Sequence, residues 1–148
     1  MDSDSVFGFL AGRWTGEEQV APSRWMQGGV SQATIENETR FGGAALVHEY
    51  QTERDGRVWF SAHGILTKGA TSDAVSLFWF DSFGFLPTEA AQGTWDGRSL
   101  IFTRNSSRGS ARHTYTFVNP DEYLLHLESS ADTGTMKTIL EGVYRKLT

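Results

Sequence analysis

Apolar and polar residues alternate with a period close to two along nearly the whole chain, and turn clusters interrupt this alternation at intervals of roughly 8 to 15 residues. Such alternation is typical of β-strands that bury one face. The pattern predicts about ten strands. They are expected over residues 13–20, 30–41, 44–54, 57–67, 73–81, 89–96, 98–106, 111–119, 122–130 and 135–147.

Short turn signals join the predicted strands. Asp55-Gly56 and Asp96-Gly97 are Asp-Gly pairs, whose tolerance of positive φ angles suits tight hairpins. Asn119-Pro120-Asp121 and Asp132-Thr133-Gly134 mark two further turns. Because these connections are short, we expect each to join antiparallel neighbours.

A sheet with this many strands must remove its exposed edges, either by closing into a barrel or by forming a two-sheet sandwich. Short connections favour closure, because a Greek-key sandwich needs long crossovers. We therefore expect an all-β fold, a closed antiparallel up-and-down β-barrel of about ten strands. A barrel of this size leaves interior space that side chains line rather than fill, so the strand count also predicts a cavity.

One short helix is expected at the N-terminus, over the segment VFGFLAG. Ser3 or Asp4 could cap its start, and Gly12 follows its end. We expect this helix to serve as a lid or plug. The chain has 148 residues and no internal repeat, low-complexity tract or linker, which indicates a single domain over residues 1–148.

The first predicted strand carries the most specific pattern, Gly12-Arg13-Trp14-Thr15-Gly16. A Gly-x-Trp pattern that opens an antiparallel barrel resembles the calycin superfamily, which includes lipocalin-like and fatty-acid-binding barrels. This resemblance implies that the Trp closes the base of the barrel and stacks against an Arg of the last strand, and Arg145 matches that position. Gly12, Trp14, Gly16 and Arg145 are therefore interpreted as barrel-closure residues.

Within that superfamily, the whole chain resembles the domain of unknown function 1579 family. The resemblance is carried by short motifs: Leu10-Ala11-Gly12-Arg13-Trp14, Phe41-Gly42-Gly43, His48-Glu49-Tyr50, Trp79-Phe80-Asp81-Ser82-Phe83-Gly84 and Glu141-Gly142-Val143-Tyr144-Arg145-Lys146. It implies a calycin-like barrel. The family has no settled activity, so a binding function is an extension of the fold rather than a property of the motifs.

Nitrobindin-like barrels share the Gly-x-Trp-x-Gly opening and hold haem iron through a His near the end of the chain. The last strand here, TMKTILEGVYRKL, contains no His, so a haem site would require His126 or His113 as a displaced axial ligand. We therefore expect no cofactor, although a haem-binding barrel remains an alternative.

Composition narrows the possible partners and location. The formal net charge of −5 and the scattered Lys and Arg residues argue against nucleic acid. The absence of Cys excludes disulfides and thiol chemistry. Acidic residues stand where a signal peptide needs basic ones, and no apolar run is long enough to span a membrane, so we expect a cytoplasmic protein without a membrane partner. Phe78 and Phe80 share one face of their strand, which indicates either a homodimer surface or coverage of this face by the loop 82–90.

The candidate site residues are polar or aromatic side chains that could point into the barrel. All four His residues lie within predicted strands, but no spacing indicates a metal site, and the sequence does not decide which face each occupies. His113 or Tyr115 could meet Glu128 across a hairpin, as a proton relay or, in the reading we favour, as an ordinary cross-strand pair. The predicted ligand-binding residues are Tyr50, His63, Trp79, His113, Tyr115, His126, Glu128 and Tyr144.

Two classes of function stay open at this point, and we predict no catalytic residue. The favoured one is a non-enzymatic binder of a small apolar or aromatic molecule in the barrel cavity, which would offer only one or two polar anchors. The other is a barrel-cavity enzyme of isomerase, cyclase or decarboxylase type, which needs several inward Tyr, His, Glu or Arg groups within hydrogen-bond reach. A packed interaction domain is a further alternative.

Overall fold

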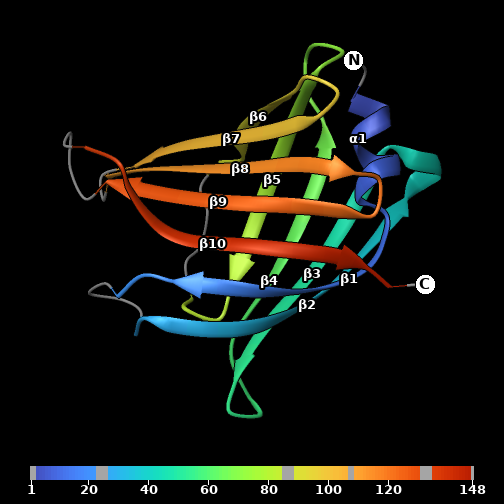
Figure 1. Cartoon of the computed structure of the whole chain (residues 1–148). Helices are drawn as coiled ribbons and strands as arrows, with labels where there is room; N and C mark the ends of the chain where they lie inside the picture. The colour runs from blue at the N-terminus through green and yellow to red at the C-terminus, as the bar shows by residue number, and fades with distance from the viewer. Residues whose placement is uncertain (1–2, 23–26, 85–88, 107–108, 131–134, 148) are drawn as a thin grey trace.

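The computed structural model describes residues 3–22, 27–84, 89–106, 109–130 and 135–147. Within these residues, ten antiparallel strands pair in sequence order, and the first strand also pairs with the last, so that the sheet closes into a barrel (Figure 1). The predicted fold class, a closed up-and-down barrel with a short N-terminal helix, is confirmed.

The bounds of the elements lie within a few residues of those predicted. They are α1 (Ser3–Leu10), β1 (Gly12–Val20), β2 (Gly29–Arg40), the short 3-10 helix η1 (Phe41–Gly43), β3 (Ala45–Arg54), β4 (Arg57–Lys68), β5 (Ala74–Asp81), β6 (Ala91–Trp95), β7 (Ser99–Ser106), β8 (Gly109–Asn119), β9 (Glu122–Ser130) and β10 (Lys137–Lys146). The expected turn at residues 132–134 lies outside the described residues.

The two Asp-Gly pairs form different turns. Asp55 and Gly56 both have positive φ angles, of 53° and 76°, as a tight hairpin between β3 and β4 requires. At the second pair, only Gly97 has a positive φ, of 99°. There the Asp96 carboxylate accepts hydrogen bonds from the backbone N–H groups of Arg98 and Ser99, at 2.8 and 2.7 Å, which makes a longer turn between β6 and β7. The expectation of a tight two-residue hairpin is therefore wrong at Asp96-Gly97.

Helix α1 covers one end of the barrel (Figure 1). Val6, Phe7 and Leu10 are buried among the inward side chains of the strands, because they form the apolar face of the helix. The Leu10 carbonyl, at the end of α1, accepts hydrogen bonds from Trp14 Nε1 and Asn37 Nδ2, each at 2.9 Å. These bonds tie the helix to β1 and β2, so α1 acts as a plug of this end.

The core is concentrated beneath this plug. Its members are buried apolar side chains from α1 and from every strand of the barrel: Val6, Phe7, Leu10, Trp14, Ala33, Ile35, Leu46, Leu66, Val75, Leu77, Trp95, Leu100, Phe102, Tyr115, Phe117, Tyr123 and Tyr144. Among the described residues, no helix is long and apolar enough to cross a membrane.

Candidate functional site

The inward-facing side chains of β3 to β9 become less buried away from α1, whereas those of β1, β2 and β10, such as Val20, Ser31 and Leu140, stay buried along the whole strand. Near α1, inward residues such as Trp14, Trp95 and Tyr123 are at most 1% exposed. On strands β3 to β9, inward positions further from the plug are only partly buried: Tyr50, Phe60, Trp79, Asp81, Arg104, Ala111, His113, Leu125, Leu127 and Ser129. These side chains point inward by strand alternation and keep partial exposure in the part of the barrel that faces away from α1. We call this part the open lumen.

A small cavity lies between the plug and the open lumen. Its volume is about 10 Å³, and it is lined by Leu10, His48, Leu66, Leu77, Trp79, Leu100, Phe102 and Tyr115. That volume is close to the minimum for a single water molecule. Side chains therefore fill the barrel near α1, and the cavity expected from the strand count is reduced here to this remnant.

A buried carboxylate stands on the inner wall beside the open lumen. Glu18 of β1 is 0% exposed, and its Oε2 accepts hydrogen bonds from the hydroxyls of Tyr50 and Tyr144, both at 2.5 Å. Its Oε1 accepts a third from Thr52 Oγ1 at 2.8 Å. Three donors on one carboxylate offset the cost of burying it. We call Glu18, Tyr50, Thr52 and Tyr144 the Glu18 cluster.

Two glycines make room for one member of this cluster. A Cβ on Gly142 would lie 2.3 Å from Tyr144 Oη, and a Cβ on Gly16 would lie 2.5 Å from Tyr144 Cδ1. The Tyr144 ring therefore lies flat against the backbone of β1 and β10, where its hydroxyl reaches Glu18. Gly16, predicted as a barrel-closure residue, therefore leaves the space that the Tyr144 ring occupies.

Burial and the neighbouring carboxylate set the ionisation of the tyrosines. Desolvation raises the pKa of Tyr50 and of Tyr144 far above the ordinary value of 10.0, and the charge of Glu18 raises both further. Desolvation, followed by the charge of Glu18, also raises the pKa of Tyr115. These phenols stay protonated at neutral pH, so each keeps a hydrogen to donate.

Two neutral histidines face the interior. Burial lowers the pKa of His48 from 6.5 to about 4, with a smaller effect of His63. Burial also lowers the pKa of His113 to about 4, assisted by Arg104 and His48. His48 Nδ1 lies 2.7 Å from Asn37 Oδ1, and the His113 ring meets Trp79 edge-on at 6.3 Å. Both imidazoles are therefore uncharged at neutral pH.

Strand β5, beside Tyr50 of the Glu18 cluster, adds an indole and a carboxylate to the interior. Trp79 Nε1 donates a hydrogen bond to Asp81 Oδ2 at 2.9 Å, and Asp81 Oδ1 accepts another from the backbone of Phe83 at 3.0 Å. Desolvation lowers the pKa of Arg104, which faces the same lumen from β7, while the charge of Asp81 opposes this shift. The open lumen is thus lined by aromatic rings with polar groups at defined points.

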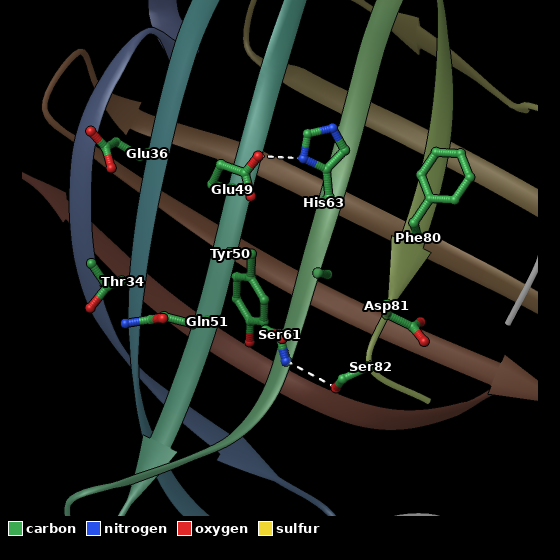
Figure 2. Close-up of a pocket in the computed structure, with 11 residues that line it drawn as sticks. Thr34, Glu36, Glu49, Tyr50, Gln51, Ser61, His63, Phe80, Asp81 and Ser82 are labelled. Carbon is green, nitrogen blue, oxygen red and sulfur yellow. Dashed lines mark hydrogen bonds and ion pairs between the residues drawn. The ribbon is translucent and has the colours of Figure 1, made fainter. Parts of the chain in front are cut away.

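A second depression lies on the outer face of the barrel (Figure 2). Its volume is about 520 Å³, and outward residues of β2 to β5 and the start of the following turn supply its polar lining: Thr34, Glu36, Glu49, Gln51, Ser61, His63 and Ser82, together with Phe80. Figure 2 shows His63 bonded to Glu49 of the neighbouring strand. Tyr50, Ala62 and Asp81 also contribute to the lining, although strand alternation directs their side chains inward.

The structure separates the predicted ligand-binding residues into two groups. Tyr50, Trp79, His113, Tyr115 and Tyr144 point into the barrel, although Tyr144 is 0% exposed and Tyr115 is buried. Tyr50 and Tyr144 meet at Glu18, and Trp79 and Tyr115 line the small cavity.

The remaining three predicted residues, His63, His126 and Glu128, lie on the outer face. His113 stands opposite Leu127 rather than Glu128, so the expected contact of His113 or Tyr115 with Glu128 is wrong. Glu128 instead lies within ion-pair distance of Arg112, at 3.9 Å, and of His126, at 3.8 Å. His126 also bonds to Thr138 at 2.8 Å, so it is not placed to ligate haem inside the barrel.

The barrel-closure prediction needs one correction. Trp14 is 0% exposed beneath α1, but the cation above its ring is Lys146, whose Nζ lies 5.1 Å from the ring centroid. Arg145 points outward, with a side chain 75% exposed and 3.9 Å from Glu122. Because neighbouring strand residues alternate between faces, only one of Arg145 and Lys146 can face the Trp.

Sequence reasoning missed Glu18, Thr52 and His48 as parts of the interior. Glu18 lies four residues after Trp14 on one strand, so alternation alone places both on the inner face. A charged residue at an inward position is a signal of a buried polar site. Within the described ranges, no group of three or more His, Cys, Asp or Glu residues is arranged to hold a metal ion.

Comparisons with known proteins agree with this architecture. The S-type phycobiliprotein lyase CPES from Guillardia theta superposes with a TM-score of 0.73 at 12% identity, covering 100% of this chain and 94% of the lyase. Rv2717c from M. tuberculosis superposes with a TM-score of 0.76 at 17% identity, covering 97% of this chain and 96% of that protein. At these identities the likeness shows the fold alone.

The sequence itself gives the family. A search among curated proteins finds no match. The family described as "Protein of unknown function (DUF1579)" matches residues 5–146, which cover most of α1 and all ten strands. The chain therefore belongs to the DUF1579 family.

Proposed function

We propose that this protein binds a small, largely apolar or aromatic molecule in the open lumen. The observation that carries the proposal is the partial exposure of inward apolar side chains, including Trp79, Leu125 and Leu127. Water reaches these side chains inside a barrel whose other half is packed. A ligand that covered them would gain roughly 25 cal/mol for each Å² of apolar surface removed from water.

The arrangement of the polar groups favours binding over catalysis. Several inward polar side chains do converge, as an enzyme would require, but the carboxylate at their centre is fully buried. Both Glu18 oxygens already accept hydrogen bonds from side chains of the barrel. A general base must reach the proton that it removes, and Glu18 has no open path to a ligand. The cluster is better suited to fixing Tyr50 than to attacking a substrate.

The similarity to known structures supports the fold of such a binder, not its ligand. One protein with this fold is a phycobiliprotein lyase, so the architecture is compatible with more than one kind of activity. The proposal therefore rests on the open lumen of this chain.

Neighbouring leucines on β9 provide a matched test. Leu125 faces the lumen, whereas Leu124 faces outward and is 39% exposed. We expect Leu125→Ala to weaken binding of the dye Nile red about tenfold, because a leucine side chain in the binding surface contributes on the order of 1 kcal/mol. Leu124→Ala should leave the affinity within about twofold of wild type.

An aromatic pair on β5 repeats the comparison with a different chemistry. Trp79→Ala removes an inward ring and should also weaken dye binding, whereas Phe80→Ala removes an outward ring and should not. Dye fluorescence measures affinity, and near-ultraviolet circular dichroism checks that each variant is folded. Equal effects of the inward and outward variants would contradict binding in the lumen. Native mass spectrometry of protein from its own host would then identify any molecule that co-purifies.

A further inference from the structure

The inner wall of β3 presents two neighbouring polar side chains to the interior, His48 and Tyr50. Their rings lie nearly parallel, with centroids 6.2 Å apart and an angle of 15° between their planes. Both rings also lie near Trp79, at 6.0 and 6.4 Å. A flat ligand beside Trp79 would therefore contact His48 and Tyr50. The positions of the hydrogen atoms on these two side chains decide which hydrogen-bonding groups such a ligand must carry.

The hydroxyl hydrogen of Tyr50 is committed to Glu18. Tyr50 Oη lies 2.5 Å from Glu18 Oε2, and the carboxylate can only accept at that contact, because it carries no hydrogen of its own. Tyr50 Oη is left with lone pairs and no hydrogen to give. A phenol that donates to a carboxylate also becomes a better acceptor, because hydrogen bonds in a chain polarise one another. Toward the lumen, Tyr50 is therefore an acceptor.

The same reasoning fixes the hydrogen of His48. The Leu10 carbonyl can only accept, so Asn37 must turn its Nδ2 toward it, at 2.9 Å, and its Oδ1 toward His48. Asn37 Oδ1 then accepts the hydrogen on His48 Nδ1, at 2.7 Å. A neutral imidazole carries one hydrogen, so His48 Nε2 holds a lone pair. This chain of bonds, anchored on α1, makes His48 a second acceptor beside Tyr50.

The indole donor of Trp79, which lies beside His48 on the same inner wall across Gly64 of β4, is already used. Trp79 Nε1 donates to Asp81 at 2.9 Å, which leaves the face of its ring as contact surface for a ligand. Phe60 extends this aromatic surface, with its ring centroid 6.0 Å from that of Tyr50. Behind Tyr50, the negative charge of Glu18 disfavours an anionic group at the same place.

We propose that the ligand of the open lumen is a neutral aromatic molecule with an N–H or O–H group that donates to Tyr50 Oη. This inference rests on the proposed function and specifies its ligand class. A ligand that offered only acceptors would leave Tyr50 Oη without a partner once water is displaced, and such an unpaired group is costly.

Indole and benzofuran test this directly, since they have the same shape and differ by an N–H group in place of an oxygen atom. We expect wild-type protein to bind indole about tenfold more tightly than benzofuran by isothermal titration calorimetry, the effect of one net hydrogen bond.

Two tyrosine variants separate this role from a general effect on the Glu18 cluster. Tyr50→Phe and Tyr144→Phe each remove one hydroxyl from Glu18 Oε2, but only Tyr50 reaches the lumen, because Tyr144 is 0% exposed. We expect the indole preference to disappear in Tyr50→Phe and to persist in Tyr144→Phe.

The possible outcomes distinguish this inference from the proposed function. Equal wild-type affinity for indole and benzofuran, or a preference that survives Tyr50→Phe, would overturn this inference and leave lumen binding standing. If neither compound bound and Nile red binding were also insensitive to Leu125→Ala, both would fall.

Discussion

Replacement of Gly142 by Ala is the sharpest test of the geometry around the buried carboxylate. The new Cβ would lie 2.3 Å from Tyr144 Oη, 2.6 Å from Cζ and 2.7 Å from Cε2. These separations are far shorter than the carbon contacts of about 3.5 to 4 Å that packed side chains make. The Tyr144 ring must therefore move away from Gly142, and its hydrogen bond to Glu18 must break.

The expected cost follows from these two changes. Loss of a hydrogen bond to a charged, buried group costs about 1.5 to 3 kcal/mol, and forcing an extra carbon into a packed site costs about 1 to 3 kcal/mol. Replacing Gly by Ala in a strand returns about 0.5 to 1 kcal/mol, because the unfolded chain loses freedom. We therefore expect Gly142→Ala to lower the free energy of unfolding by about 2 to 5 kcal/mol, a large part of the stability of an ordinary domain.

Urea denaturation followed by tryptophan fluorescence measures this change, since the chain contains five Trp residues. Gly8→Ala is the control, because a Cβ there meets nothing within 4 Å, and Ala in a helix should be neutral or stabilising by up to about 1 kcal/mol. In a Tyr144→Ala background the obstacle is gone, so adding Gly142→Ala should cost little. A decrease in the free energy of unfolding below about 1 kcal/mol for Gly142→Ala alone would refute the close packing of the Tyr144 ring against Gly142.

Two further predictions concern charged groups. The pKa of His48 and of His113 is lowered in the folded state to about 4, so the unfolded chain binds more protons below pH 6.5, and stability should fall as the pH drops from about 6.5 to 4. Denaturation midpoints across this range should show the loss, and a His48→Gln/His113→Gln variant should flatten it; an unchanged slope in that variant would assign the loss to other groups. Lys146→Met should cost about 0.5 to 1 kcal/mol by removing the cation over Trp14, whereas Arg145→Met should change stability by less than about 0.5 kcal/mol in the same urea assay. Equal costs for the two variants would contradict this assignment.

Much of the barrel could be predicted from the chain because its signals are local. A period of two, short turns and the absence of long connections require antiparallel neighbours, and the closed sheet is the way in which such strands avoid free edges. The tight turn at Asp55-Gly56 was likewise readable, because positive φ at both positions suits this pair. Asp96-Gly97 has the same letters but forms a longer turn, because the Asp96 side chain bonds to the following backbone.

The sequence did not determine whether each histidine faces the barrel interior or its outer surface. On β4, the residues directly before and after His63 are apolar. Ile65, which shares the outward face of His63, is only partly exposed. Apolar residues such as Phe78 and Phe80 also occur on the outer face of β5, so hydrophobicity does not identify the inner face there. The structure places His48 and His113 inside and His63 and His126 outside, which the pairing of whole strands decides.

The sequence by itself determined the strands, their order and the expectation of a closed barrel, because each of these follows from neighbours in the chain. Only the tertiary structure decided that Glu18 meets Tyr50, Thr52 and Tyr144. Residues 18 and 144 are 126 positions apart and lie together because β1 pairs with β10 at the closure of the barrel. How far side chains fill the interior was also decided in three dimensions, because it depends on the summed volume of all inward residues and the plug. The physical reason is that alternation along a strand determines which face of the sheet a residue occupies, whereas closure of the barrel determines which residues of other strands it contacts.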